Sequence, residues 1–242
     1  MIMKECPGFP DPHYLSSNFH LLTSSAGASS LFSDHYSFDA PGLPVPVFYP
    51  EKPLPEIPID IPDDIVLFVI PSAYTYIKGQ DILLHAIKSL PDDYRSKAIF
   101  LFFGYTLPKE EDYKNRLIQL ADTLDNVILL DALPQIDAYA LMNKADCIIA
   151  PSRIDTIPLT VVEGMMFNKL VLVSSNTGIS SYITDCVNGF VFSDHDELIK
   201  RLLLIISDRN NLKRISDGGH NIYSEFFSPD SVSKRCSELG IL

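Results

Sequence analysis

The fold is decided by residues 65–90, which read IVLFVIPSAYTYIKGQDILLHAIKSL. The run from Ile65 to Ile70 is apolar without a break, and the segment from Gln80 to Leu90 places its apolar side chains on one face of a helix. A strand that is apolar on both faces has to be covered on both faces, as in a parallel sheet with crossover helices. Residues 65–90 therefore predict one strand and one crossover helix of such a sheet.

The same alternation recurs along the rest of the chain. Further strands are predicted at Ala98–Phe103, Val127–Leu130, Cys147–Ala150, Leu170–Ser174 and Phe190–Phe192, and further helices at Glu110–Leu124, Ile136–Ala145, Pro158–Phe167 and Asp196–Ser207. This series predicts an α/β fold, a Rossmann-like parallel sheet with helices on both faces. In such sheets ligands bind beyond the carboxyl ends of the strands, so the loops after the strands are where a site is expected.

Charge and composition exclude several classes of protein. The chain has 31 acidic and 19 basic side chains, a formal charge of −12 that repels a phosphate backbone, so we expect no nucleic-acid partner. The four cysteines lack the spacing of a zinc site or a disulfide framework. No apolar run is long enough to cross a bilayer and the first residues lack a signal-peptide pattern, so we expect a cytoplasmic protein without a transmembrane segment.

The loop after the fourth predicted strand carries the first candidate site. Pro158 suits the first turn of a helix, which would put the helix cap at Thr156 or Ile157. The backbone N–H groups of Ile157, Leu159 and Thr160 would then be free. Together with the helix dipole they would form a seat for a diphosphate.

Two carboxylates accompany this loop. Glu163 lies in an otherwise apolar segment, where a carboxylate is costly unless hydrogen-bonded, and the hydroxyls of a ribose are suitable donors. The alternative is that Glu163 caps a neighbouring loop or pairs with a lysine. Asp155 would lie beside the diphosphate seat, close to where a sugar would hang, or would serve only as a helix cap.

The loop after the first strand carries the second candidate site. It contains Ser72 and Lys78, and it opens the next helix. The Lys78 ammonium would come within reach of phosphates at the strand ends. The alternative is an ordinary surface lysine that precedes the glycine of a helix start.

These segments together resemble the C-terminal domain of the retaining glycosyltransferases of family 4, which have the two-domain GT-B architecture. The resemblance runs from about Phe19 to the end of the chain. It is carried by ADCIIAPS at 145–152 with DTIPLTVVE at 155–163, by KGQD at 78–81, by residues 126–134, by NTG at 176–178 with NGFVF at 188–192, and by EFFSP at 225–229. The family has two glutamates eight positions apart, and this chain keeps the spacing with Asp155 and Glu163.

The resemblance implies a role for each candidate residue. Glu163 would bind the ribose of a nucleotide-sugar, Asp155 would contact the donor sugar beside the reacting carbon, and Lys78 would neutralise the diphosphate leaving group. The remaining donor contacts would come from Ser72, Arg153, Thr156, Ile157, Leu159 and Thr160. It implies a nucleotide-sugar as donor substrate, with no metal and no further cofactor.

Departures from the family pattern accompany the matches. The family usually has a glycine and often an arginine after the first strand, where this chain has Pro71, Ser72 and Ala73, so one phosphate cation is missing and Arg153 is the candidate to replace it. Asp155 is one methylene shorter than glutamate, and a shift of about 1 Å can cost about a hundredfold in rate. Asp131 stands where the family usually has a glycine, and Ser181 stands where it often has an acidic residue.

The chain divides by composition into three parts. Residues 41–62 hold eight of the eighteen prolines and are predicted to be a linker. Residues 1–40, with a possible strand at Phe19–Thr23 and helix at Ala28–Tyr36, would be a remnant of the acceptor-side domain, and residues 63–242 the donor-binding domain.

Such a division predicts partly uncovered apolar surface where the missing domain would pack. The candidates are Leu21, Leu22, Leu31, Phe32, Val232 and Leu239. We therefore expect a partner chain that supplies an acceptor domain, or self-association.

Three hypotheses about function remain at this point. The first is a retaining glycosyltransferase of the hexosyl-transferring type, acting in surface polysaccharide or glycolipid synthesis, with this chain as the donor half and incomplete alone. The second is a non-catalytic or split-enzyme subunit with a degenerate nucleotide pocket. The third is another Rossmann-like enzyme, such as an epimerase or dehydrogenase, which the absence of a Gly-x-Gly-x-x-Gly loop disfavours.

Overall fold

The computed structural model describes residues 42–209 and 212–240. Within these ranges one parallel sheet has the strand order β3-β2-β1-β4-β5-β6. Its strands are β1 (Val66–Pro71), β2 (Ala98–Phe103), β3 (Val127–Leu130), β4 (Cys147–Ala150), β5 (Leu170–Ser174) and β6 (Phe190–Phe192). Five strands have the predicted bounds. The first begins one residue later than predicted, because Ile65 donates its N–H to the Pro62 carbonyl in a turn (3.0 Å).

The helices alternate with the strands as the sequence predicts. They are α2 (Gln80–Lys88), α3 (Asp92–Arg95), α4 (Glu111–Ala121), α5 (Gln135–Lys144), α6 (Leu159–Met166), α7 (His195–Asp208), α8 (Lys213–Ile222) and α9 (Pro229–Glu238). A π-helical turn (Tyr223–Phe227) joins α8 to α9, and short 3₁₀ turns lie at Tyr76–Lys78, Pro108–Glu110 and Gly178–Tyr182. Helices α3, α8 and α9 were not predicted. None of the described helices is long and apolar enough to span a membrane.

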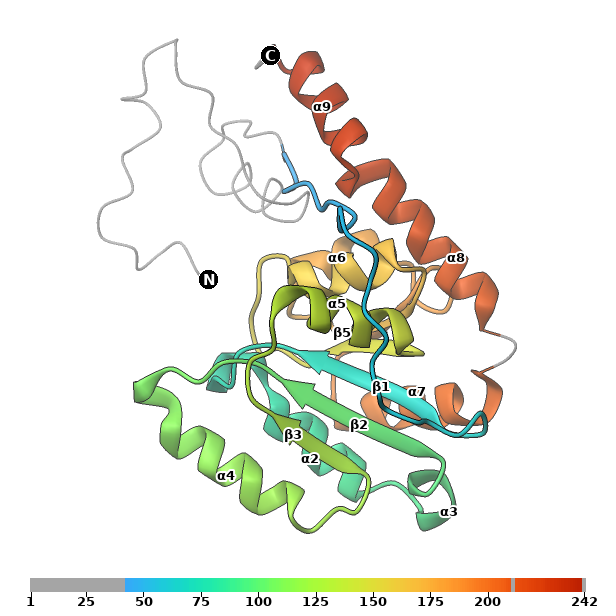
Figure 1. Ribbon diagram of the computed structural model, residues 1–242. Coiled ribbons are helices and arrows are strands. Elements are labelled where there is room, and N and C mark those ends of the chain that lie inside the picture. The colour runs from blue at the N-terminus through green and yellow to red at the C-terminus, as the bar shows by residue number, and fades with distance from the viewer. Residues whose placement is uncertain (1–41, 210–211, 241–242) are drawn as a thin grey trace.

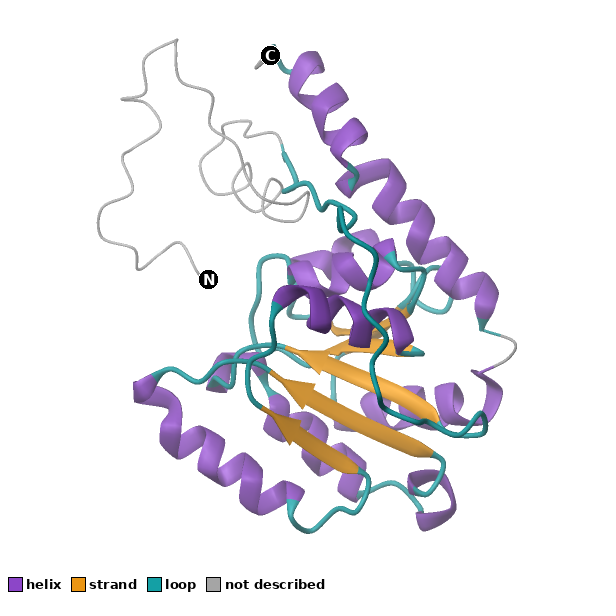
Figure 2. Ribbon diagram, in the orientation of Figure 1, coloured by secondary structure: helices purple, strands orange, loops and turns teal. Residues whose placement is uncertain are grey.

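The sheet separates two apolar clusters. Side chains on one face of the sheet, such as Phe68 and Ile70 of β1, pack with α2, α4 and α7. Side chains on the other face, such as Leu67 and Val69, pack with α5, α6 and the π-helical turn. Figures 1 and 2 show the sheet between these two helical layers. The predicted α/β class, a parallel sheet with helices on both faces, is confirmed.

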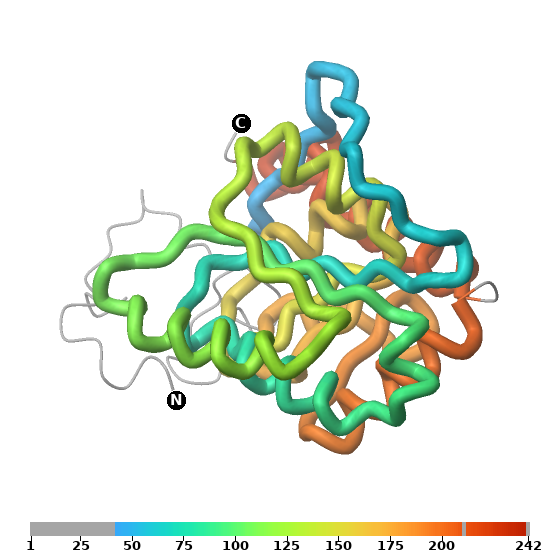
Figure 3. The backbone as a smooth tube through the Cα atoms, turned by 60° about the horizontal axis from the view of Figure 1, so that its bottom comes forward, coloured from blue at the N-terminus to red at the C-terminus, as the bar shows by residue number. Residues whose placement is uncertain are grey.

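Residues 43–62, which we call the strap, run without helix or strand along the outer surface of the layer that contains α5 and α6 (Figure 3). Ile57, Ile59 and Ile61 alternate with exposed residues and pack against the second cluster. The Val47 N–H donates to the Phe227 carbonyl (2.9 Å). The strap is thus part of the folded unit, and the predicted limits of the three domains stay a prediction.

The expected partly uncovered apolar surface is wrong for Val232, which is buried with 7% of its surface exposed. Leu239 is half-buried, so its side chain is partly uncovered as expected. The other expected positions, Leu21, Leu22, Leu31 and Phe32, and the predicted strand and helix around them, lie outside the described residues. Val232 is covered because the helix that carries it continues from the π-helical turn, which packs into the second cluster.

Candidate functional site

A cavity of about 470 Å³ opens at the carboxyl ends of the strands. Its lining includes residues of the loops after β1, β2, β3 and β4, the first turns of α6 and one side of α5. β1 and β4 are neighbours in the sheet, and the strand order changes direction between them. The crevice at such a change of direction is where ligands bind in open α/β sheets. Of the predicted site residues, the lining includes Ser72, Lys78, Asp155, Ile157, Leu159, Thr160 and Glu163.

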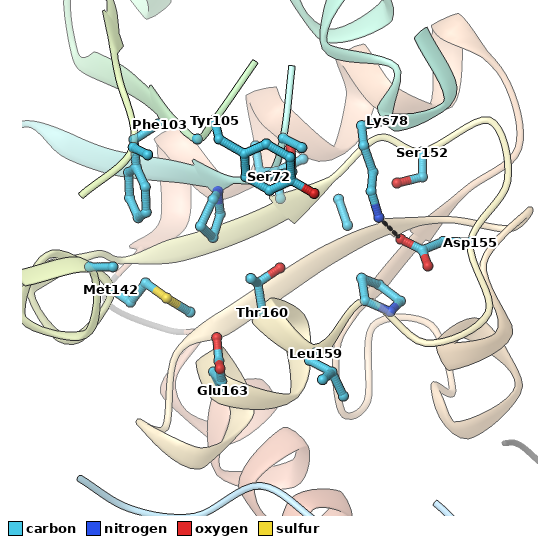
Figure 4. Close-up of a pocket in the computed structure, with 18 of the residues that line it drawn as sticks. Ser72, Lys78, Phe103, Tyr105, Met142, Ser152, Asp155, Leu159, Thr160 and Glu163 are labelled. Carbon is cyan, nitrogen blue, oxygen red and sulfur yellow. Dashed lines mark hydrogen bonds and ion pairs between the residues drawn. The ribbon is translucent and has the colours of Figure 1, made fainter. Parts of the chain in front are cut away.

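The two predicted catalytic residues contact each other. The Lys78 ammonium lies 2.5 Å from Oδ2 of Asp155, and both side chains are mostly buried, with 25% and 12% of their surface exposed (Figure 4). The backbone of Asp155 is fixed by the loop after β5, because its carbonyl accepts from Gly178 N–H (3.0 Å). Three loops therefore determine where this ion pair lies, and it occupies one side of the cavity.

Two glycines allow the loops to approach each other closely. Gly79 has φ +69°, and a Cβ added there would lie 2.2 Å from the Pro151 carbonyl oxygen. A Cβ added to Gly104 would lie 2.1 Å from the Ser72 carbonyl oxygen. The backbones after β1, β2 and β4 are thus in direct contact, which a residue with a side chain would prevent. The glycine after Lys78 is needed for this contact between loops.

Arg153 is turned away from the cavity, contrary to its predicted role. Its guanidinium makes two hydrogen bonds of 2.7 Å to the Asp81 carboxylate and lies 3.9 Å from the centre of the Tyr76 ring. The bonds to Asp81 raise the pKa of Arg153 above its usual range. Burial raises the pKa of Asp81, but the hydrogen bonds from Arg153 and Tyr113 outweigh burial and leave it lowered. Arg153 does not line the cavity, because its charge is already matched, and it joins the loop after β4 to the start of α2.

A buried glutamine supports the loop after β1. Gln80 is 1% exposed, and its Nε2 donates to Ser72 Oγ (2.9 Å) and to the Ala73 carbonyl (2.7 Å). The Tyr113 hydroxyl donates to the Gln80 Oε1 (3.2 Å) and to Asp81 (2.7 Å). Sequence reasoning missed these supports. The polar pair Gln80-Asp81 at the helix start was the available signal, but its partner Tyr113 is 32 residues away in the sequence.

Helix α6 begins one residue later than predicted. Its cap is Pro158, with ψ 104°, rather than Thr156 or Ile157, and the Val161 N–H is taken by the Pro158 carbonyl (2.9 Å). The extended ψ of Pro158 keeps that residue out of the helix. Thr156 is exposed and does not line the cavity. Within the described ranges, no protein acceptor pairs with the backbone N–H groups of Ile157, Leu159 or Thr160, so the predicted free donors are present at the cavity.

Glu163 points from α6 into the cavity (Figure 4). Its Oε1 accepts a hydrogen bond from the Tyr139 hydroxyl of α5 (3.1 Å). Burial raises the pKa of Glu163 above its ordinary value, and the bond from Tyr139 opposes that shift. Neither alternative from the sequence, a loop cap or a lysine pair, describes this contact. Glu163 is a half-buried carboxylate with one tyrosine donor.

Two further departures from the family pattern lie on the surface. Asp131 forms an ion pair with Lys114 and its side chain is 87% exposed, while the Ser181 hydroxyl donates to the Gly178 carbonyl (2.8 Å). In the part of the chain that the structure describes, no cluster of three His, Cys, Asp or Glu side chains is arranged to hold a metal ion. The cavity's chemistry thus comes from one lysine, two carboxylates, hydroxyls and free backbone N–H groups.

The chain resembles several known proteins in sequence or in fold. The chain is 24% identical over 180 residues to a glycogen synthase of Thermodesulfovibrio yellowstonii, covering 73% of this chain and 35% of that protein. Among solved structures, HepE of Anabaena in complex with UDP and glucose superposes with a TM-score of 0.65 at 24% identity, covering 74% of this chain and 49% of that one. A glycosyltransferase of Rickettsia africae superposes with a TM-score of 0.74 at 18% identity, covering 97% and 66%.

The chain spans less than half the length of the glycogen synthase and of HepE. The structural similarities, all below 25% identity, concern the fold. A family model described as "Glycosyl transferases group 1" matches residues 56–221, which include every strand of the sheet and the whole cavity lining. The chain therefore belongs to the group 1 glycosyl transferases.

Proposed function

We propose that this chain is the donor-binding half of a retaining glycosyltransferase of family 4 that uses a nucleotide-sugar, with a saccharide or lipid-linked acceptor and a role in surface polysaccharide or glycolipid synthesis. The observation that carries the proposal is that Lys78, Asp155 and Glu163 border one cavity at the carboxyl ends of β1 and β4, where the strand order changes direction. A cation, a helix N-terminus and a carboxylate are the groups that a diphosphate and a ribose require.

The proposed pose follows from the order of these groups along the cavity. The diphosphate lies at the first turn of α6, beside the Lys78 ammonium and the free N–H groups of Leu159 and Thr160. The ribose hydroxyls donate to Glu163, one turn further along α6. The sugar then lies next to Asp155, whose carboxylate is close to Lys78.

Lys78 has a role in the chemical step as well as in binding. When the bond between the sugar carbon and the diphosphate breaks, the electron pair leaves with the diphosphate, and negative charge grows on its oxygen. A fixed cation at that oxygen stabilises the transition state more than the bound donor. The solved complex of HepE with UDP and glucose supports the choice of a nucleotide-sugar as ligand.

The test is calorimetric titration of the purified protein with UDP, GDP and ADP, followed by the same titration of Glu163→Ala. We expect one of the three nucleotides to bind, and the variant to lose about 1–3 kcal/mol of binding free energy, because the ribose hydroxyls lose their acceptor. Glu56→Ala, which removes an exposed glutamate of the strap, is the control and should bind as the unchanged protein does. Unchanged binding by a folded Glu163→Ala would refute the ribose assignment.

A further inference from the structure

A chain of hydrogen bonds leads through the cavity wall to Glu163. Gln135 Nε2 donates to the Tyr139 hydroxyl oxygen (3.1 Å), and the Tyr139 hydroxyl donates to Glu163 Oε1 (3.1 Å). All three side chains line the cavity, two from α5 and one from α6. No local sequence pattern joins Tyr139 to Glu163, since 24 residues separate them.

The direction of these bonds is fixed by chemistry. The amide nitrogen of Gln135 can only donate, so the Tyr139 oxygen accepts from it and keeps its own proton for Glu163. Burial and the nearby Glu163 raise the pKa of Tyr139 to about 12, so the hydroxyl stays protonated at neutral pH. Tyr139 is therefore a permanent donor aimed at the carboxylate.

The ring of Tyr139 is held in place by packing. It meets Phe167 edge to face, with ring centres 5.6 Å apart, and Phe167 in turn meets Tyr49 of the strap at 6.5 Å. Aromatic pairs in this geometry favour one orientation. The hydroxyl therefore points at Glu163 before any ligand arrives.

Glu163 depends on this donor. Among the described residues, Tyr139 is the side chain that bonds the Glu163 carboxylate. The other charged side chains of the cavity, Lys78 and Asp155, bond each other. Without the tyrosine, burial would act on the charged carboxylate unopposed, and the carboxylate would be free to rotate.

We propose that Tyr139 is a positioning residue for nucleotide recognition: it holds Oε1 of Glu163 and leaves the rest of the carboxylate facing the ribose hydroxyls. The inference rests on the proposed function, since it needs Glu163 to be the ribose acceptor. A carboxylate has about four acceptor positions, so one bond from Tyr139 leaves room for both hydroxyls of a ribose.

The sign of the pH effect follows from the same contacts. Removing the hydroxyl of Tyr139 removes what opposes burial, so the pKa of Glu163 rises further. Near pH 6 a larger fraction of Glu163 is then protonated and has to lose its proton before it accepts from the ribose. At higher pH a larger fraction of the carboxylate is ionised in both proteins, so the loss of orientation accounts for more of the effect.

The experiment is calorimetric titration of Tyr139→Phe at pH 6 and pH 8 with UDP and 2′-deoxy-UDP, or with GDP or ADP and its 2′-deoxy form if the unchanged protein binds that nucleotide instead. We expect UDP affinity to fall about five- to tenfold at pH 6 and about two- to threefold at pH 8, corresponding to about one hydrogen bond at the lower pH. The loss for 2′-deoxy-UDP should be smaller at both values, because that ligand uses Glu163 less. UDP binding should also release more protons from the variant than from the unchanged protein at pH 6.

The matched control is Tyr49→Phe. The Tyr49 hydroxyl donates to the Met166 carbonyl (2.8 Å), at the other end of α6, and its ring also packs on Phe167. This variant loses a hydroxyl that bonds the same helix, α6, and that belongs to the same group of packed rings, without touching the cavity lining. It should leave both affinities and their pH dependence unchanged. Gln135→Ala, an exposed position, is a second test and should show a weaker form of the Tyr139→Phe effect.

The outcomes separate the two proposals. A loss in Tyr139→Phe that is the same for both ligands, or the same at both pH values, would make Tyr139 a structural residue and overturn the inference. Unchanged UDP binding by Tyr139→Phe, with binding lost in Glu163→Ala, would overturn it too while the ribose site stands. If the unchanged protein binds none of the nucleotides, the proposed function fails, and this inference fails with it.

Discussion

Lys78 reaches the cavity with its charge already matched by Asp155. Both residues belong to the proposed donor site, and there the carboxylate competes with a diphosphate for the same ammonium. A diphosphate that binds at Lys78 would have to share or replace the Asp155 contact. In the proposed site Asp155 would therefore oppose binding of a nucleoside diphosphate, even though it borders the position proposed for the sugar.

We predict that Asp155→Asn strengthens binding of UDP by about three- to tenfold and leaves binding of uridine unchanged, because the freed ammonium acts only on phosphates. Lys78→Ala should weaken binding of UDP, and it should weaken binding of uridine less. Titration of the two variants with the two ligands gives all four affinities.

Asp92→Asn is the control for the change in net charge. It removes a carboxylate from a surface ion pair with Arg95 in α3, which precedes β2 and therefore lies at the amino ends of the strands, away from the cavity. A similar gain in Asp92→Asn would mean that the effect is general electrostatics. Equal losses of UDP and uridine in Lys78→Ala would mean that the lysine acts through the structure of the loop.

At the scale of elements, the site depends on how closely three loops meet. Gly79 lies where the loop after β1 turns into α2, against the Pro151 carbonyl that follows β4. The contact sets the distance between the Lys78 loop and the Asp155 loop. A wider separation would pull the ion pair apart.

We predict that Gly79→Ala lowers the free energy of unfolding by more than the about 1–2 kcal/mol that a left-handed backbone costs a non-glycine residue, because the new Cβ also meets a carbonyl oxygen. UDP affinity should fall as well. Gly240→Ala is the control, since Gly240 also has φ +69° but a Cβ there meets nothing within 4 Å. Chemical denaturation of both variants measures the two costs. Equal small losses would contradict the proposed close contact.

The strands could be predicted from sequence because they are short, continuous apolar runs that need cover on both faces. The C-terminal helices could not. Helix α8 reads KRISDGGHNI, and its two glycines oppose a helix on propensity alone. They are tolerated because Gly218 and Gly219 pack against the backbone at Val187 and Asn188, where an added Cβ would lie 3.0 Å or less from the nearest atom. Such tertiary contacts leave no local pattern.

The candidate site, too, could be predicted from the sequence only in part. Lys78, Asp155 and Glu163 could be predicted because each stands in a family motif, and the structure brings them to one cavity. Their roles stay a prediction. The partners Tyr139 and Tyr113 could not be predicted, since they reach the site from helices far away in the sequence. The position of Arg153 outside the cavity lining could not be predicted either, because its partner Asp81 lies 72 residues away.

At the scale of the whole molecule, many exposed apolar side chains lie near the cavity. Among the described residues, six of the twelve large apolar side chains that are exposed lie on the loops at the carboxyl ends of the strands and at the start of α6: Tyr76, Ile77, Tyr105, Leu107, Ile154 and Leu159. This is the same end of the sheet as the cavity. A surface of that kind on one side of a donor site fits a second domain that closes over it.

We predict that the fold formed by the described residues binds nucleotide by itself but transfers sugar only with a facing domain that excludes water and holds the acceptor. Light scattering after size-exclusion chromatography, beside a transfer assay with UDP-sugars and GDP-sugars, tests this directly. Monomers that transfer sugar to an acceptor would contradict it. Release of free sugar without transfer would agree with it, since an open site admits water.

The strap is connected to the cavity through α6. Tyr49 binds the carbonyl of Met166, the last residue of α6, while the first turn of α6 and Glu163 border the cavity. Helix α6 has eight residues and five of them are buried, so its two ends belong to one packed element. A displacement of the strap that keeps the Tyr49 bond would therefore be passed along α6 toward Glu163. The strap and the proposed nucleotide site thus contact opposite ends of the same helix.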